Sequence, residues 1–210
     1  MATSPNDPAS PVVVLLAAGE GSRFGGIKQL ADIAGEPMVR RVARIALETG
    51  LPVITVTGAH AALVETVLDD LAVNIVHCED WQLGMGNSLA TGIRELAHRF
   101  PHASSVLICL ADQPLLDAAF IRAMLQRHAE APDRLLATEQ NGILGPPALF
   151  PRDCFATLMA QSGSRGARAL LEQEAERVDA FAAPNAFDVD TPDDLRRVRD
   201  WLTRDPPQTT

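Results

Sequence analysis

The stretch Val12-Val-Val-Leu-Leu-Ala-Ala-Gly19-Glu-Gly21-Ser-Arg23-Phe-Gly25-Gly26-Ile-Lys28-Gln-Leu passes from an apolar, β-branched run directly into a glycine-rich turn. The apolar run predicts a buried strand, and glycines allow the backbone after it to turn tightly and approach a ligand. Peptide N–H groups in such a turn can face an anion, and Arg23 and Lys28 add full positive charges. This segment therefore predicts a phosphate-binding loop after the first strand, with a purely structural turn as the alternative.

Two common phosphate-binding motifs do not fit this loop. The Rossmann pattern G-x-G-x-x-G would begin at Gly19, but Phe24 occupies its third glycine position. The P-loop pattern would begin at Gly21, but Ile27 stands where its lysine is required. Gln29 also lacks the hydroxyl that binds magnesium in a P-loop. The sequence therefore excludes dinucleotide dehydrogenases and P-loop NTPases.

The composition is that of a compact, acidic protein without a membrane segment. The chain has 210 residues, of which 47% are hydrophobic, enough for the core of one α/β domain. Its net charge of −9 argues against nucleic acid as a partner. The apolar run at Val12 to Ala18 is too short to span a bilayer, and no basic region precedes it. Cys78, Cys109 and Cys154 lack C-x-x-C spacing and are expected to be packed, reduced thiols of a cytoplasmic protein.

Short β-rich runs alternate with helical patterns along the chain. The predicted strands are Val12–Ala17, Val53–Thr57, Val73–His77, Ser105–Ala111 and Leu135–Thr138. One helix is predicted directly after Pro37. The other predicted helices cover Ala61–Leu71, Ser88–Arg99, Ala118–Ala129, Arg152–Gln161, Arg165–Glu176 and Pro192–Leu202. Such alternation predicts an α/β fold in which helices cover both faces of a mostly parallel central sheet, a three-layer α/β/α arrangement. We expect a single domain over residues 12–203, between a disordered lead at 1–11 and a disordered tail at 204–210.

Two carboxylates are candidates for a metal site at the carboxyl ends of the strands. Asp112 directly follows the fourth predicted strand, and Asp190 precedes a helix start in which Thr191 is the expected N-cap. Magnesium takes one or two carboxylates together with phosphate oxygens and water, so this pair suits it. Asp188 is the alternative to Asp190. A capping role is the alternative for Asp112, although Asp117 is better placed for that role.

Two further segments are candidate nucleotide contacts. Thr57 and Gly58 follow the second predicted strand, and Ser88 lies in a glycine-rich turn that opens a helix. A helix N-terminus and a hydroxyl can hold part of a nucleotide, but Asn87 or Ser88 could equally be a simple N-cap. The five histidines show no metal-ligand spacing.

The loop resembles the pattern L-A-A-G-x-G-x-R-[FM]-G-x-x-K, the opening signature of nucleotidyltransferases that use an NTP to activate small phosphorylated compounds. Leu16 to Lys28 match it in register. Later blocks are similar to those of molybdenum cofactor cytidylyltransferases, so that the resemblance extends from about residue 12 to about residue 202. These blocks are Gly84-Met-Gly-Asn-Ser-Leu, Leu110-Ala-Asp-Gln-Pro, Gly145-Pro-Pro-Ala-Leu-Phe-Pro-Arg and Asp188-Val-Asp-Thr-Pro-Asp-Asp-Leu. One block departs from the pattern, because Ser164 follows Gly163 where relatives usually have aspartate.

The resemblance implies a Rossmann-like nucleotidyltransferase fold and a Mg²⁺-dependent transfer of CMP from CTP to the phosphate of molybdopterin, with release of pyrophosphate. It implies catalytic roles for Arg23, Lys28 and Asp112, and it places Mg²⁺ on Asp112 and Asp190. The nucleotide-binding residues implied are Leu16, Ala17, Ala18, Gly19, Gly21, Arg23, Lys28, Thr57, Gly58 and Ser88. A molybdoenzyme or its maturation factor is a further implied partner.

Three other functions stay open at this point. Two are nucleotidyl transfers: a guanylyltransferase of the same cofactor pathway, and a cytidylyltransferase for a polyol phosphate. The third is a non-catalytic carrier of the molybdenum cofactor. Ala18 favours CTP, because relatives that use GTP commonly have glycine there. The charged residues Arg23, Lys28, Asp112 and Asp190 argue against a carrier, which needs no paired metal carboxylates.

Overall fold

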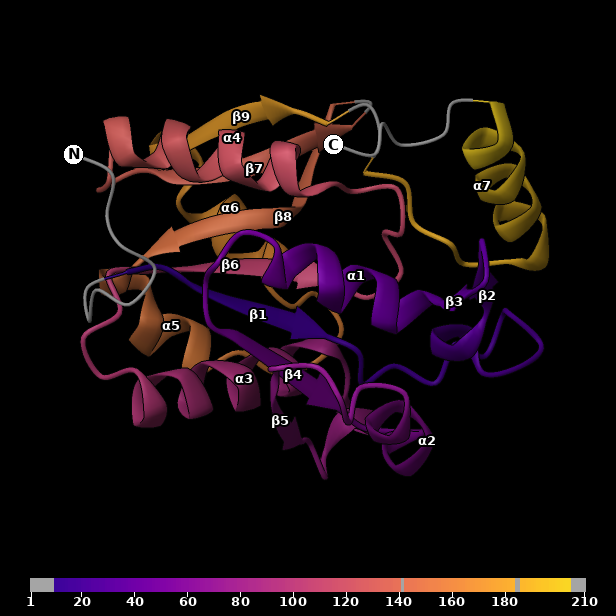
Figure 1. Ribbon diagram of the computed structural model, residues 1–210. Coiled ribbons are helices and arrows are strands. Elements are labelled where there is room, and N and C mark those ends of the chain that lie inside the picture. Colours follow the sequence, from indigo (N-terminus) through magenta and orange to yellow (C-terminus); the bar gives the residue numbers. More distant parts are fainter. Residues whose placement is uncertain (1–9, 141, 184–185, 205–210) are drawn as a thin grey trace.

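A seven-stranded sheet in the order β5-β4-β1-β6-β8-β7-β9 forms the centre of the molecule (Figure 1). Its strands are β1 (Val12–Leu16), β4 (Val53–Thr57), β5 (Asn74–His77), β6 (Ser105–Leu110), β7 (Leu135–Gln140), β8 (Ile143–Pro151) and β9 (Val178–Ala182). The structure, a computed structural model, describes residues 10–140, 142–183 and 186–204. Most of the predicted lead (1–11) and tail (204–210) lies outside these ranges. Of the described remainder, Ser10 is buried and Arg204 ends the last helix.

The sheet is mostly parallel, as predicted. β1 pairs in parallel with β4 and β6, β4 with β5, and β7 with β9, whereas β8 runs antiparallel to both of its neighbours. The strands β8 and β9 were not predicted. β8 contains Gly145, Pro146 and Pro147, residue types that normally interrupt strands. β9 is a partly exposed edge strand without a continuous apolar run.

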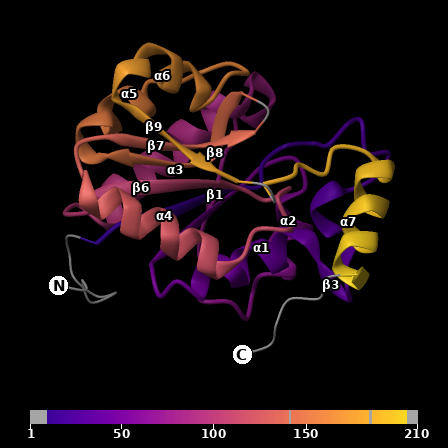
Figure 2. The same ribbon diagram turned by 90° about the horizontal axis from the view of Figure 1, so that it is seen from above.

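Helices cover both faces of this sheet (Figure 2). One face packs against α1 (Met38–Leu47), α2 (Ala61–Thr66) and α4 (Ala118–Glu130). The other face packs against α3 (Met85–Arg99), α5 (Phe155–Met159) and α6 (Arg168–Gln173). β1 is buried on both sides, which explains its uninterrupted apolar sequence. The three-layer α/β/α arrangement expected from the sequence is confirmed.

Several predicted helices are shorter than expected. The helix predicted over Ala61–Leu71 ends at Thr66. The segment predicted over Arg152–Gln161 consists of a 3₁₀ turn (Arg152–Cys154) followed by the short helix α5. Two further 3₁₀ turns, Lys28–Leu30 and Trp81–Leu83, lie next to the carboxyl ends of the strands, and a fourth covers Ala175–Arg177.

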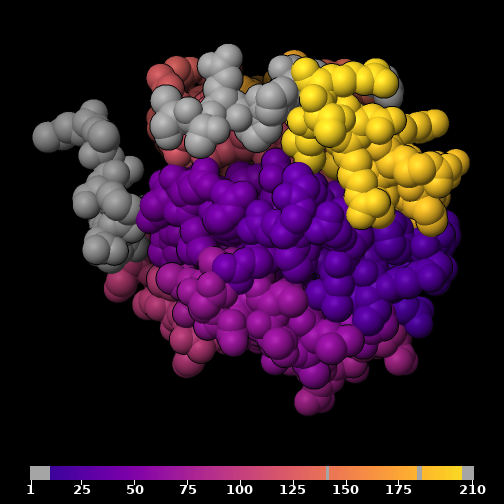
Figure 3. Space-filling view, turned by 45° about the vertical axis from the view of Figure 1, so that its right-hand side comes forward, coloured from indigo at the N-terminus to yellow at the C-terminus, as the bar shows by residue number. Residues whose placement is uncertain are grey.

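The helix α7 (Pro192–Arg204) stands apart from both layers and packs against the two-stranded sheet of β2 (Asp32–Ile33) and β3 (Glu36–Pro37). Figure 3 shows it as a yellow mass beside the indigo surface of the N-terminal segment. Ile33, Val198 and Leu202 belong to the apolar cluster between them, and Phe24 from the glycine-rich loop packs against the same cluster. None of the described helices is long and apolar enough to cross a membrane.

Candidate active site

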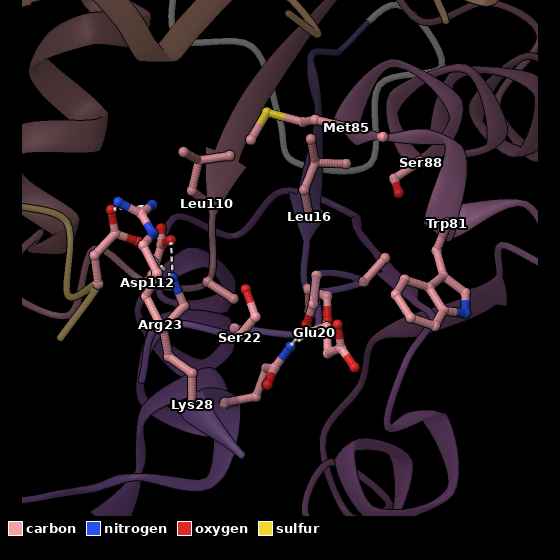
Figure 4. A pocket seen from close by; sticks show the side chains of 18 of the residues that line it. Leu16, Glu20, Ser22, Arg23, Lys28, Trp81, Met85, Ser88, Leu110 and Asp112 are labelled. Carbon is pink, nitrogen blue, oxygen red and sulfur yellow. Dashed lines mark hydrogen bonds and ion pairs between the residues drawn. The ribbon is translucent and has the colours of Figure 1, made fainter. Parts of the chain in front are cut away.

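A pocket of about 410 Å³ opens at the carboxyl ends of β1 and β6, where the strand-end rule places ligands in open α/β sheets (Figure 4). Its walls come from four segments that are far apart in the sequence: the loop after β1, the turn before α3, the end of β6, and the segment before α7. The lining includes these predicted site residues: Leu16, Ala17, Ala18, Gly19, Gly21, Arg23, Lys28, Ser88, Asp112 and Asp190.

The glycine-rich loop presents a row of free backbone donors. Ala17 still donates its amide to Val56, but within the described part of the chain no amide of residues 18–23 donates to a protein acceptor. Gly21 makes the turn possible: its φ is +68°, and a Cβ there would lie 2.9 Å from Cβ of Lys28. A run of unpaired peptide N–H groups along a loop is an anion-binding arrangement.

Four charged side chains meet at one side of the pocket. Nζ of Lys28 donates to Oδ2 of Asp112 at 2.8 Å and to Oδ1 of Asp190 at 3.1 Å. Arg23 donates to the other oxygen of Asp190 at 2.9 Å. The Lys28 side chain is only 13% exposed, whereas Arg23 is 74% exposed. Lys28 is therefore held between two carboxylates in the interior, whereas Arg23 pairs with Asp190 at the solvent-exposed side.

The carboxylates are positioned by backbone and side-chain hydrogen bonds from neighbouring segments. The Val189 amide donates to the carbonyl of Asp112 at 2.9 Å, which ties the segment before α7 to the end of β6. Gln113 donates its side-chain amide to Oδ1 of Asp188 at 2.9 Å and to the Pro146 carbonyl at 3.0 Å. Asp188 thus points toward Gln113 and a neighbouring pocket, and Asp190 is the residue that faces Asp112 across Lys28.

Two pKa shifts follow from this geometry. Burial by itself would lower the pKa of Lys28, but the charges and hydrogen bonds of Asp112 and Asp190 outweigh it, so the pKa is raised and the ammonium stays charged. Although Asp188 as a residue is exposed, its carboxyl group faces inward. Burial of that group and the charge of Asp112 raise the pKa of Asp188 to about 6, against the opposing hydrogen bond from Gln113.

The residues Asp112 and Asp190 fit a hard divalent cation. Both carboxylates converge on one cationic centre, at present the Lys28 ammonium. Oδ1 of Asp112 is buried and has no hydrogen-bond partner among the residues that the structure describes. Those residues hold no cluster of three or more His, Cys, Asp or Glu side chains suited to a metal. A cation here would therefore need ligands from phosphate and water, which is how Mg²⁺ is usually bound.

The opposite side of the pocket is apolar. Figure 4 shows Trp81 across from Arg23 and Asp112, with Leu16 between them. The exposed Met85 adds to this wall, and the hydroxyl of Ser88 lies near Trp81. The pocket therefore has a charged end and an apolar end, as a nucleotide has a triphosphate and a base.

The structure places two of the predicted nucleotide contacts outside the pocket lining. Thr57 is fully buried, and its hydroxyl donates to Glu65 of α2 at 2.9 Å. Gly58 lies behind the loop, since a Cβ there would lie 2.6 Å from the carbonyl oxygen of Ala18. That Cβ would also lie 2.8 Å from the Ala18 methyl, so this methyl faces Gly58.

The turn before α3 does not contain the N-cap that the sequence offered as an alternative at Asn87 or Ser88. α3 begins at Met85, and Gly84 occupies the N-cap position without a side-chain cap. Asn87 instead accepts a hydrogen bond from the Gly163 amide at 3.2 Å, so neither Asn87 nor Ser88 is the N-cap. In contrast, the predicted caps Asp117 and Thr191 are confirmed, because each accepts from the amide three residues further on.

Several lining residues were not predicted from the sequence. Most of them belong to residue types that occur throughout the chain, so only their place next to motif residues could have marked them. They are Glu20, Ser22, Gln29, Met38, Trp81, Gln82, Gly84, Met85, Leu110, Ala111 and Ser164.

A second pocket of about 590 Å³ adjoins the first and shares Met85, Leu110 and Ser164 with it. Its walls carry polar and charged side chains from the segment after β6, from β7, from α6 and the turn before it, and from the segment before α7. They include Gln113, Thr138, Gln140, Arg165, Arg168 and Asp188. Two adjoining pockets can hold two substrates, which a transfer reaction requires.

Comparison with known proteins gives a consistent family. The profile of the family described as the MobA-like NTP transferase domain matches residues 13–178. The purine catabolism protein PucB of Bacillus subtilis is 28% identical over 198 residues, covering 89% of this chain and 94% of that protein. The bifunctional protein GlmU of Bacillus cereus is 32% identical over 142 residues, which make up 66% of this chain but only 29% of that protein.

A solved structure agrees with the fold. The crystal structure of Rv0371c from Mycobacterium tuberculosis superposes with a TM-score of 0.78 at 26% identity, covering 91% of this chain and 99% of that one. The same protein has also been solved in complex with manganese, and that structure superposes with a TM-score of 0.73 at 25% identity.

Proposed function

The chain belongs to the MobA-like NTP transferase domain family and is a nucleotidyltransferase, and we propose that it transfers CMP from CTP to the phosphate of molybdopterin with release of pyrophosphate. One observation carries the nucleotide part of this proposal. One pocket with an apolar far side is lined by residues 18–23, whose amides are unpaired, and by Lys28 with the two carboxylates that it bridges. We place the reaction in the cytoplasm, where the three buried free thiols stay reduced.

The proposed step is an in-line displacement at the α-phosphorus. An oxygen of the acceptor phosphate forms a bond to this phosphorus while the bond to the oxygen bridging the α- and β-phosphorus breaks, and pyrophosphate leaves with that electron pair. A phosphate monoester has a second pKa of about 6 and is already mostly ionised at pH 7, so the step needs no general base. The protein contributes orientation and positive charge.

In this proposal each charged residue has a separate role. Arg23 and the amides of residues 21–23 stabilise the leaving pyrophosphate, and Lys28 contacts the phosphates. Asp112 and Asp190 would hold Mg²⁺, which when bound neutralises phosphate charge. The manganese complex of Rv0371c supports a divalent ion in this group of proteins.

We place the acceptor in the second pocket. It adjoins the nucleotide pocket, and positive charge for a phosphate comes from Arg168 and from Arg165, which pairs with Glu172 at 3.0 Å. Gln113, Gln140 and the Asp188 carboxyl supply donors and acceptors of the kind that a pterin ring needs. CTP is proposed over GTP because relatives that use GTP commonly have glycine at the position of Ala18. A molybdoenzyme or its maturation factor would receive the product.

The decisive experiment measures pyrophosphate release from CTP, GTP, ATP and UTP, each with molybdopterin or a polyol phosphate and with Mg²⁺. We expect release with CTP and molybdopterin. Release with GTP instead would assign a guanylyltransferase, and release with the polyol phosphate would reassign the acceptor. Molybdopterin binding without release from any NTP would identify a carrier and contradict the proposed transfer.

A further inference from the structure

Gln29 follows Lys28 in the 3₁₀ turn and is 4% exposed. Its side-chain amide donates to the carbonyl oxygen of Ala17 at 3.2 Å and also to that of Gly19. Oε1 of Gln29 is buried and accepts no hydrogen bond from any described residue. Exchanging the nitrogen and oxygen would put an acceptor against two carbonyl oxygens, so the hydrogen-bonding environment fixes the orientation of this amide.

These two hydrogen bonds set the direction of two peptide units in the loop. In a trans peptide the N–H points opposite to the C=O of the same unit. Because the carbonyls of Ala17 and Gly19 point toward Gln29, the N–H groups of Ala18 and Glu20 point away from it. Both N–H groups belong to the unpaired row of residues 18–23. Gln29 therefore determines where two free donors are aimed.

Ala18, which carries one of these donors, lies at the apolar end of the pocket. Ala18 adjoins Gly58, and a Cβ on Gly58 would lie 2.6 Å from the Ala18 carbonyl and 2.9 Å from Cβ of Trp81. Figure 4 shows Glu20 below Leu16, between Trp81 on one side and Arg23 and Asp112 on the other. Peptide donors beside an aromatic ring suit a planar heterocycle that carries carbonyl or ring-nitrogen acceptors. The phosphates would lie at the charged end.

We propose that Gln29 is a positioning residue for nucleotide recognition: it aims the Ala18 and Glu20 amides at the nucleobase without touching the nucleotide. This inference rests on the proposed function, in that it requires an NTP in this pocket. It predicts that losing the Gln29 donor weakens binding of a whole nucleotide much more than binding of its phosphates alone.

The test is calorimetric titration of wild type and Gln29→Met with CTP, GTP, ATP and UTP, and with inorganic triphosphate. Methionine has nearly the length of glutamine but cannot donate a hydrogen bond. For the NTP that the wild type binds best, we expect Gln29→Met to weaken binding about tenfold or more, with less than about a threefold loss for triphosphate. Gln126→Met, on the exposed side of α4, is the matched control and should bind both as the wild type does.

Each other outcome has a definite meaning. Unchanged NTP binding in Gln29→Met, or an equal loss for NTP and triphosphate, would overturn the proposal. If Gln29→Met does not fold, NMR of the wild type tests the proposal instead. The amide resonances of Ala18 and Glu20 should then shift when the NTP is added but not when triphosphate is added. A shift with triphosphate but not with the NTP would overturn the proposal. NTP binding without transfer would refute only the proposed function, and a wild type that binds no NTP would refute both.

Discussion

Asp112 is the residue on which the proposed chemistry depends most. One of its oxygens accepts from Lys28 at 2.8 Å, and the other is buried without a partner among the described residues. Asp112→Asn preserves volume but removes the charge that a cation and the Lys28 ammonium both require. We expect kcat to fall roughly 10²- to 10³-fold, the usual cost of losing one electrostatic stabiliser, with a smaller loss of stability than in Lys28→Met, because Asp190 still pairs with Lys28. Normal kcat at ordinary Mg²⁺ concentrations would contradict the metal assignment.

Lys28 and Arg23 should differ in what they contribute to stability. Arg23 is 74% exposed, so Arg23→Ala should reduce NTP use while leaving the melting temperature unchanged. Lys28 lies between Asp112 and Asp190, so Lys28→Met leaves two neighbouring carboxylates without their shared cation. We expect a loss of about 1 to 3 kcal/mol of stability.

Thermal melts of Lys28→Met with and without Mg²⁺ test the reason for that loss. A divalent ion can replace the missing charge between Asp112 and Asp190, so Mg²⁺ should raise the melting temperature of Lys28→Met more than that of Arg23→Ala. An equal response of the two variants would show that the carboxylates do not share a cation site.

Arg23, Lys28 and Asp112 could be predicted as site residues because charged side chains that closely follow a buried apolar strand stand out in the sequence. Thr57 could have been excluded as a nucleotide contact by strand alternation. Val53 packs in the core on the side of α1 and α2, and Thr57, four residues later, must face the same side, where it meets Glu65. Gln29 and Trp81 could not be predicted, since nothing in a single sequence shows that a glutamine will reach two carbonyls of its own loop.

The start of α7 is the element that holds the metal-facing carboxylate in place. The Asp194 side chain accepts from the amides of Asp190 and Thr191 at 3.3 and 2.9 Å, and Thr191 accepts from the Asp194 amide. This reciprocal capping box joins helix stability to the position of Asp190. Burial would raise the pKa of Asp194, but the hydrogen bond from the Thr191 hydroxyl at 2.7 Å and those from the Thr191 and Asp190 amides lower it below its ordinary value.

Asp194→Ala should therefore cost about 1 kcal/mol of stability and also raise the Mg²⁺ concentration needed for half-maximal activity. Asp193→Ala is the matched control, because Asp193 is exposed and pairs only with Arg196 of the same helix among the described residues. Stability is read from chemical denaturation and the metal requirement from initial rates. If both variants need the same Mg²⁺ concentration as the wild type, the capping box does not position Asp190.

Elements were predictable where local pattern and tertiary environment agree. β1, β4 and β6 are buried on both faces, so their apolar runs identify them. β8 depends on long-range pairing with β6 and β7, which overrides its prolines. α3 begins three residues before the predicted Ser88, because Gly86 docks through its amide on the Gly163 carbonyl at 2.7 Å. Contacts between residues so far apart cannot be inferred from one sequence.

At the scale of the whole molecule, the parallel topology assembles the site. Segments near residues 16–28, 81–88, 110–112 and 188–190 are separated along the chain but meet at one edge of the sheet. The strand-end rule predicts the meeting of the first and third of these segments. It does not predict the fourth, which reaches the edge through the Val189 to Asp112 hydrogen bond. The sequence therefore indicates at which edge of the sheet the candidate site lies, and the structure adds that Lys28 pairs with Asp112 and Asp190 there.

The pH dependence of global stability should carry the signature of a histidine far from this site. His128, in the last turn of α4, is 7% exposed, and its Nδ1 has no hydrogen-bond partner in the described part of the chain. Burial lowers the pKa of His128, against weaker opposing effects of the Arg134 backbone and Asp133. In the unfolded chain this histidine takes up a proton near pH 6.5, whereas the folded state resists it. Its contribution to stability is therefore complete above about pH 6.5 and is lost as the pH falls below it.

Replacing the histidine should flatten this dependence. We expect the drop in melting temperature between pH 7.5 and pH 5.5 to be smaller in His128→Gln than in the wild type, with the exposed His102→Gln as the control. Asp188 acts in the opposite sense. Because its pKa is raised to about 6 in the folded state, its contribution to the stability of the fold decreases as the pH rises from about 4 to 6. It therefore cannot produce the same loss on acidification. If His128→Gln still loses as much stability as the wild type, the group that destabilises the fold in acid must be a different one.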